Sequence, residues 1–254
     1  MVVSSKIALV VTLSGTSLFA GTVESVSVPV AEDESVISNR PDQNYANNLV
    51  RGGLFTGVDG GFSGASHFYL KFHLPDFDPA SSVLDAKLVG FWFDEFAPAQ
   101  QDTHGIHFVA YDGWTELNLT WANQPGPAYG TAQAMWETSG GSPGEFVSID
   151  LTNIADQEYR GDGTLSVMFK ASNESMDPTN RNWQYFVEHE ADPERAFRLE
   201  ITLGTVESLP PDGLANVGEP VNVIPLPPAA WGAAGMLGIL VAHRLGKRMH
   251  AMVA

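Results

Sequence analysis

Alternation of apolar and polar residues dominates the chain between residues 30 and 203. The clearest case is residues 66–74, in which every even position from 68 onward is apolar. The odd positions of this segment carry His67, Tyr69, Lys71 and His73. Because side chains alternate across a strand, this pattern predicts a β-strand with one face in the core and the other face outward.

Similar patterns recur along the chain and predict an all-β fold. Strong strand patterns cover residues 86–93, 105–111, 164–170 and 196–203. Weaker patterns cover residues 35–38, 48–52, 146–151 and 183–188. Glycine- and proline-containing breaks separate these segments, and only residues 153–159 suggest a helical turn or two. About nine short strands with this spacing are typical of a β-sandwich or a closed barrel.

Segments without strand patterns complete the domain layout. Residues 112–145 and 171–182 are expected to form ordered surface loops. Residues 205–223 are rich in Pro, Gly and Glu and indicate a flexible linker. We therefore expect a folded domain over residues 21–204.

The N-terminal residues 1–20 have the pattern of a secretory signal peptide. Lys6 is their only charge, an apolar stretch follows at residues 7–13, and small residues precede an expected cleavage after Ala20. This pattern predicts an exported protein. The alternative is a buried N-terminal strand or helix.

The C-terminal residues 224–254 suggest a membrane-associated sorting segment. Fourteen uncharged residues from Ala229 to Ala242 precede Arg244, Lys247 and Arg248. A full helical span uses about 20 residues, so this is a marginal transmembrane helix whose basic end would stay in the cytoplasm. The middle of the chain would then face outward, on the cell envelope or cell surface.

The residues before this helix, Ile224-Pro225-Leu226-Pro227-Pro228-Ala229, resemble the PEP-CTERM class of bacterial sorting signals, in particular its VPLPA-like variety. The resemblance implies processing by an exosortase-type enzyme in a bacterium that makes exopolysaccharide. Ile224 and Pro228 depart from the usual Val and Ala. A plain C-terminal anchor is the alternative.

Composition narrows the possible partners. The chain has 13 basic and 30 acidic residues, a net charge of −17, which disfavours nucleic acid because its phosphates would be repelled. There is no cysteine, which excludes disulfides, thiolate zinc sites and a thiol nucleophile.

Several segments in the middle of the chain resemble the DNRLRE family, which is related to jelly-roll carbohydrate-binding modules. The most specific is Trp114-Thr115-Glu116-Leu117-Asn118-Leu119-Thr120-Trp121-Ala122-Asn123-Gln124-Pro125, close to the family pattern W-x-E-x-x-x-T-W-x-N-x-P. Further matches lie at residues 42–52, 69–74, 86–88, 146–152, 186–190 and 198–201. The resemblance implies a non-catalytic jelly-roll β-sandwich that binds polysaccharide, with Trp114 and Trp121 in a structural corner.

Sugar binding needs flat aromatic faces together with a few polar groups. The candidates are Trp136, Trp183, Tyr185, Tyr129 and Arg181, with Trp114 as a weaker one. A basic patch for an acidic glycan would need Arg181, Arg195 and Arg198 to converge. Core packing is the alternative role for each aromatic residue.

Calcium needs several oxygen ligands, and Asx residues gather near the first predicted turn. The candidate ligands are Asn39, Asp42, Asn44 and Asn47. Jelly-roll sugar modules often hold a structural calcium near their terminal strands, so the resemblance adds Glu200 or Asp150. Turn formation is the alternative role for these residues.

A histidine zinc site is not expected. His104 and His107 would point to opposite faces of one strand, and His67 and His73 would lie about 20 Å apart along another. Neither pair converges on one ion.

Enzymatic activity is the competing hypothesis. The sequence has neither G-x-S-x-G nor G-x-x-x-x-G-K, although Glu116, Glu188 and Glu190 would suit the acid–base work of a lyase or glycosidase. The leading hypothesis is a non-catalytic, surface-tethered protein that binds polysaccharide in an exopolysaccharide or biofilm matrix. A third hypothesis is a purely structural surface protein, which gains weight if Trp136, Trp183 and Tyr185 are buried.

Overall fold

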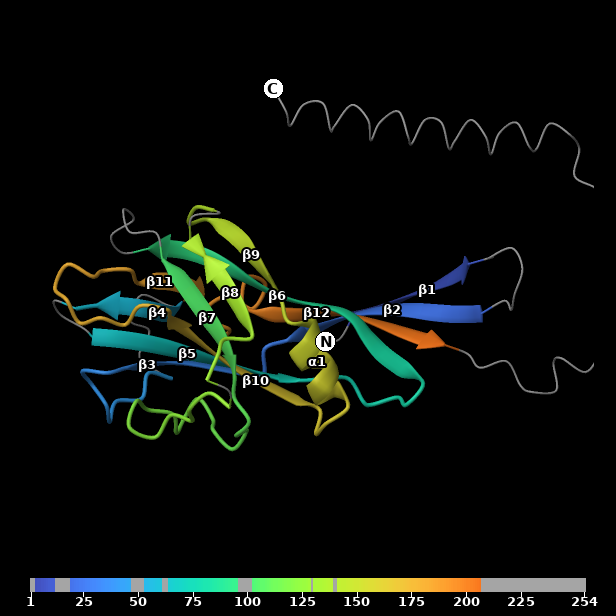
Figure 1. The fold of residues 1–254 in the computed structure, drawn as a ribbon, viewed down its shortest axis with the longest axis horizontal. Coiled ribbons are helices and arrows are strands. Elements are labelled where there is room, and N and C mark those ends of the chain that lie inside the picture. Colours follow the sequence, from blue (N-terminus) through green and yellow to red (C-terminus); the bar gives the residue numbers. More distant parts are fainter. Residues whose placement is uncertain are drawn as a thin grey trace, which may run out of the picture. The chain divides into compact units, whose positions relative to one another are not determined.

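The computed structural model describes residues 3–11, 19–46, 53–60, 64–95, 102–128, 130–138 and 141–206. These residues form twelve strands and one α-helix (Figure 1). The first six strands are β1 (Val3–Val11), β2 (Phe19–Pro29), β3 (Glu32–Ile37), β4 (Gly53–Asp59), β5 (Gly64–His73) and β6 (Ser81–Glu95). The others are β7 (Thr103–Phe108), β8 (Ala134–Glu137), β9 (Glu145–Asp150), β10 (Thr164–Ala171), β11 (Gln184–Val187) and β12 (Arg198–Val206), with α1 at Thr152–Tyr159.

The prediction of an all-β fold is confirmed. The five strongest patterns became β5, β6, β7, β10 and β12, and three of the weaker ones became β3, β9 and β11. The fourth weak pattern, at residues 48–52, lies outside the described residues. Strands β1, β2, β4 and β8 were not expected, and β8 interrupts the predicted loop at 112–145. The helical turns expected at 153–159 are α1.

The strands form a curled antiparallel sheet whose two layers are joined through β4. One layer runs β2–β12–β6–β11–β4, with β1 on β2 and β9 on β6. The other runs β4–β5–β10–β7–β8, with β3 on β5. This arrangement fits the expected β-sandwich, and its jelly-roll connectivity stays a prediction.

Strand β4 changes layers at Gly57. Residues 53–56 pair with β11, whereas Gly57, Val58 and Asp59 pair with β5. Gly57 has φ +130°, and an added Cβ would lie 2.5 Å from the carbonyl oxygen of Asn182. The switch therefore needs a glycine, since other residues are strained in this conformation.

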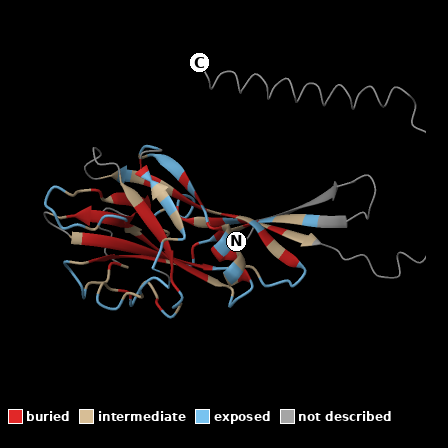
Figure 2. Cartoon of the chain, in the orientation of Figure 1, coloured by how far each residue is buried: buried red, intermediate tan, exposed pale blue. Residues whose placement is uncertain are grey.

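The main core lies between the two layers. Five buried phenylalanines pack at its centre: Phe68, Phe72, Phe169, Phe186 and Phe197. Figure 2 shows buried residues in red along the inner strands, while β8 and β9 carry exposed residues. Burial of the inward positions of β5, β10 and β12 is the reason for the alternation seen in the sequence.

The outer face of β5 does not face solvent, which corrects one expectation. Tyr69 is fully buried, and Lys71 and His67 are 4% and 8% exposed, because residues 112–125 cover this face. Of the expected outward residues, His73 is exposed. A second hydrophobic cluster forms beneath the cover: Val36, Tyr69, Val109, Trp114, Leu119 and Met168.

The predictions for the two ends are not tested by this fold. Residues 3–11 of the expected signal peptide form β1, which pairs with β2. Strand β12 continues to Val206, just past the expected start of the linker at residue 205. The expected sorting segment at 224–254 lies outside the described residues. Within the described part of the chain, no helix is long and apolar enough to cross a membrane.

Replacing Phe68 with Ala tests the position of the core. We expect Phe68→Ala to lower the free energy of unfolding by about 3–5 kcal/mol, because truncation leaves a cavity. Phe68 has no exposed surface and contacts the rings of Phe169, Phe186 and Phe197. Chemical denaturation followed by circular dichroism measures the change.

The matched control is Phe77→Ala, because Phe77 is 48% exposed and contacts the single ring of Tyr159. Its cost should stay below about 1.5 kcal/mol. Equal costs for the two variants would contradict this description of the core.

Candidate functional site

The cover segment, residues 112–125, is held on β5 by buried polar contacts. The Lys71 Nζ donates to the Trp114 carbonyl, lies 4.5 Å from the centre of the Trp114 ring and is 3.1 Å from Glu32 Oε1. The Tyr69 hydroxyl donates to Gln124 Oε1 at 2.8 Å. Trp114 is 2% exposed, so its place beneath the cover matches the structural role that we expected for it.

His67 ties the same segment to a second loop. Its ring lies 4.6 Å from that of Trp121, and its Nε2 is 2.5 Å from Glu174 Oε1. The Nδ1 atom is 2.9 Å from Gln124 Oε1. These contacts connect residues 121–124 with the loop that follows β10.

Two of the expected sugar-binding residues pack inside the domain. Tyr185 is 5% exposed, and the half-buried Trp183 stacks on Phe55 with ring centres 5.3 Å apart. Tyr45 and Ile37 complete the same cluster. This end of the molecule therefore uses its aromatic residues mainly for packing.

The other expected residues are dispersed. Arg181 Nε is 3.1 Å from Asp59 Oδ1 at the end of β4, and Tyr129 lies outside the described residues. Trp136 on β8 is half-buried, and its ring meets the edges of Trp92 and Phe186 at 5.1 Å. Among the described candidates, Trp136 borders a cavity of about 240 Å³.

A trough runs between β8 and β9, each of which pairs with one strand alone in the described structure. The larger of its two cavities, about 680 Å³, is lined by residues 84–85, 133–135 and 148–154. The smaller, about 240 Å³, is lined by Trp92, Trp136, Phe146 and their neighbours. Both include Ser148, and we call the pair the edge trough. Strands β8 and β9 lie side by side at the top of Figure 1.

Aromatic and cationic groups adjoin the edge trough on the outer face of β6, β9 and β12. The rings of Phe91 and Phe146 meet edge to face at 5.1 Å. Arg195 lies 5.0 Å over Phe91 and Arg198 lies 5.3 Å over Phe146. Two of the three arginines considered for a basic patch therefore come together here, each also paired with a carboxylate.

A third cavity, of about 440 Å³, lies among residues 102 and 173–182. It is lined by polar side chains: Asp102, Asn173, Ser175, Asp177, Thr179, Asn180 and Asn182. Without an aromatic ring in this lining, it offers no flat face for a sugar to stack on.

The structure describes four of the five candidate calcium ligands. Asn44 donates through Nδ2 to the carbonyls of Glu116 and Leu119, the latter at 2.8 Å, and so attaches the first turn to the cover segment. Glu200 on β12 accepts from Arg198 at 3.0 Å. Asn39 and Asp42 are exposed in the turn after β3, and Asn47 lies outside the described residues.

Asp150, the other residue considered for calcium, accepts hydrogen bonds from Thr152, the first residue of α1. Its Oδ1 accepts from the Thr152 amide at 3.0 Å and from the Thr152 hydroxyl at 2.7 Å. These bonds, followed by the ion pair with Lys87, lower the pKa of Asp150 to about 2.

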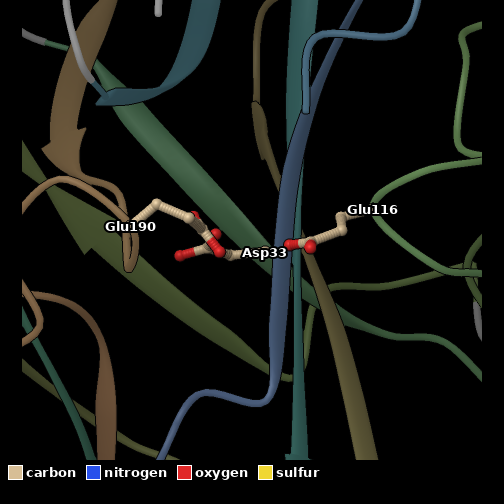
Figure 3. Close-up of side chains that lie close together, drawn as sticks. All are labelled: Asp33, Glu116 and Glu190. Atoms are coloured by element: carbon tan, nitrogen blue, oxygen red, sulfur yellow. The ribbon is translucent and has the colours of Figure 1, made fainter. Parts of the chain in front are cut away.

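Acidic side chains gather at a different place, where β3, the cover segment and the turn after β11 meet. Carboxylate oxygens of Asp33, Glu116 and Glu190 lie within 4.8 Å of one another (Figure 3). Glu34 and Glu188 lie close enough to this group to affect its ionisation. The sequence had pointed to Glu116 and Glu190 as acid–base candidates, but nothing in the local pattern linked them to Asp33.

Burial and mutual repulsion disfavour negative charge in this group. Burial, and then the charge of Glu190, raise the pKa of Asp33 and of Glu116 above their ordinary values. Burial raises the pKa of Glu34 to about 9 and that of Glu188 to about 7. Protons or a cation must therefore neutralise the carboxylates when they are this close.

Strand β11 ends at Val187, so Glu188 and Glu190 lie beyond it, in the segment that follows the strand. On β7, His104 packs against Trp136. The charges of Lys170, His67 and Glu174 affect the pKa of His107. The two histidines thus point to opposite faces, as the strand period predicted.

Comparison with known families adds an independent observation. The model of carbohydrate-binding module family 96 matches residues 24–188. The chain belongs to this family. No curated protein matches the sequence. The matched region begins within β2 and ends just after β11, so it includes both edges of the trough.

Membership of a carbohydrate-binding module family makes the protein a non-catalytic module with a carbohydrate-binding role. The prediction that it is not an enzyme agrees with this family. The convergent carboxylates of Asp33, Glu116 and Glu190 do not line the edge trough, so they are not placed to act on a chain bound there.

Replacing Lys71 with Met tests how the cover segment is held. We expect Lys71→Met to lower the free energy of unfolding by about 3–5 kcal/mol, because Glu32 and the Trp114 carbonyl lose a buried cation. Urea denaturation followed by tryptophan fluorescence measures the loss.

Lys87→Met is the matched control. Lys87 pairs with Asp85 and Asp150 at the surface, where ion pairs contribute little. A Lys71→Met protein as stable as Lys87→Met would show that the contacts of Lys71 do not hold the cover segment.

Proposed function

We propose that this carbohydrate-binding module binds polysaccharide along the edge trough, at the surface of the cell that exports it. The observation that carries the proposal is the match to carbohydrate-binding module family 96, together with an aromatic-lined trough inside the matched region. The DNRLRE-type resemblance and its jelly-roll topology agree with such a module.

The edge trough has the groups that a sugar polymer needs. Trp136 borders one cavity, and Phe146, which is 50% exposed, presents an accessible ring beside it. Backbone and side-chain polar groups of Ser148, Asp150 and Asn153 line the adjoining cavity. Aromatic rings supply contact area at low entropic cost, and the polar groups fix the orientation of the sugar.

The charge of the protein bears on which polysaccharide binds. A net charge of −17 repels polyanions in general. Arg195 and Arg198 beside the trough supply planar donors that suit a carboxylate on an acidic sugar. Neutral and uronate-containing polysaccharides therefore both belong in a binding test.

The two ends of the chain support export and tethering. Residues 1–20 have the pattern of a signal peptide, and residues 224–254 combine a PEP-CTERM-like motif with a short apolar segment and a basic tail. In this proposal the linker at 205–223 holds the module away from the membrane until an exosortase-type enzyme processes the tail. The module would then remain in an exopolysaccharide matrix.

A purely structural surface protein is the second candidate. The packing of Trp183 and Tyr185 against Phe55 favours it, because these rings offer little surface for a ligand. The binding experiment below distinguishes the two candidates.

Affinity electrophoresis against immobilised polysaccharides tests the trough, with and without Ca²⁺. We expect a panel of neutral and acidic polymers to include at least one that retards the wild type. Phe146→Ala should weaken that binding between about twofold and tenfold, the range for loss of one aromatic contact.

The matched control is Phe77→Ala, because Phe77 is 48% exposed, as Phe146 is 50% exposed, but does not line the trough. It should bind like the wild type. Retardation that is unchanged in Phe146→Ala would place the polysaccharide elsewhere, and no retardation of the folded wild type would favour the structural candidate.

Export predicts a defined mature N-terminus. N-terminal sequencing of protein from the envelope fraction is expected to begin at Gly21, which pairs with Val206 at the far end of the β2–β12 ladder. An Ala20→Gln variant should slow cleavage and retain the precursor. Unprocessed protein recovered from the cytoplasm would contradict the proposal.

A further inference from the structure

Three carboxylates from separate segments converge at the meeting point of the two layers and the cover. Asp33 comes from β3, Glu116 from the cover segment and Glu190 from the turn after β11. In Figure 3, Glu190 and Glu116 approach Asp33 from opposite sides. Their oxygens lie within 4.8 Å of one another.

The burial of the Asp33 side chain is a second observation that points to a bound ion. Asp33 is 2% exposed, and its Oδ2 accepts the His189 amide proton at 3.0 Å. Its buried Oδ1 has no hydrogen-bond partner among the described residues. Buried polar atoms in native proteins are nearly always paired, so an unpaired carboxylate oxygen inside a group of ligating side chains points to a missing partner.

The backbone holds the three side chains in place. The Glu116 amide donates to Glu32 Oε2 at 2.9 Å, and the Glu116 carbonyl accepts from Asn44. The His189 amide bond fixes Asp33 next to Glu190. Lys71, the nearby buried cation, is engaged by Glu32 and by the Trp114 carbonyl rather than by this group.

We propose that Asp33, Glu116 and Glu190 bind a divalent cation, and that this cation is Ca²⁺. The donor set is carboxylate oxygen, which hard cations prefer. Ca²⁺ takes six to eight oxygen ligands at about 2.3–2.6 Å, whereas Mg²⁺ demands near-ideal octahedral geometry and usually keeps several of its waters. Ca²⁺ also tolerates irregular geometry, and water completes its shell on the side of the exposed Glu190.

The ion would join three parts of the fold that the backbone ladders leave separate. Strand β3 is paired with β5, the turn after β11 belongs to the other layer, and the cover segment lies outside both. An ion held by all three binds the folded state and not the unfolded chain, and therefore stabilises the fold. The site would act apart from the edge trough, since it shares no lining residue with it.

Thermal unfolding of the full-length chain in CaCl₂ and in chelator tests the site. We expect the Tm to rise by roughly 5–10 °C at a hundredfold excess of Ca²⁺ over its Kd. Equilibrium dialysis with radioactive calcium should give one saturable site, with Mg²⁺ competing weakly. No saturable binding at millimolar Ca²⁺ would overturn the proposal.

The Asp33→Asn variant shows whether Asp33 acts as a calcium ligand or has a structural role alone. The amide keeps an acceptor for the His189 N–H but removes the unpaired charge. The variant should lose the calcium-dependent rise in Tm, while its Tm in chelator stays equal to or above that of the wild type. A Tm that falls equally in chelator and in calcium would show a structural role and overturn the assignment.

Two further variants control for misfolding and for non-specific effects of removing a carboxylate. Glu190→Gln changes an exposed side chain and should weaken calcium binding at least tenfold without altering the fold in chelator. Glu200→Gln, on β12 beside Arg198, should leave calcium binding unchanged. Calcium binding that survives in Asp33→Asn and Glu190→Gln, or that is lost in Glu200→Gln, would refute the site.

Discussion

Strand β5 is buried on both faces, and much of the remaining structure depends on this. Its even positions lie in the main core with β10, β11 and β12, while Tyr69 and Lys71 lie beneath the cover segment. A buried lysine is tolerated because Glu32 and the Trp114 carbonyl surround it, so removing either partner would leave an expensive unpaired group. The cover is therefore fixed by polar contacts as much as by apolar packing.

The cover in turn creates the acidic group. By placing residues 114–121 across the edge strand β3, it brings Glu116 next to Asp33, and the turn after β11 adds Glu190 from the other layer. The carboxylates come together because the two layers and the cover segment meet at this point. Their mutual repulsion makes the stability of this junction depend on the protons or cations that neutralise them.

The opposite side of the molecule is left open. Strands β8 and β9 end their respective layers without pairing to each other in the described structure, and the edge trough lies between them. Unpaired edges invite association with other strands. Here short strands and exposed polar side chains limit that risk, and Trp136 and Phe146 leave an aromatic border suited to a carbohydrate.

The sequence by itself determined the all-β fold class, the inward faces of β5, β10 and β12, the position of α1 and the structural place of Trp114, because these depend on local alternation and on one compact motif. The sequence offered Trp136, Trp183 and Tyr185 alike as sugar-binding candidates. The alternation pattern does not distinguish an aromatic ring at the surface from one that packs on Phe55, as that of Trp183 does. The sequence also offered Asn44 and Glu200 as candidate calcium ligands, whereas the carboxylate oxygens that the structure brings together belong to Asp33, Glu116 and Glu190. Only the tertiary structure decided these matters, because they depend on contacts between residues more than 70 positions apart, such as the bond of Asn44 to the cover and of Asp33 to His189.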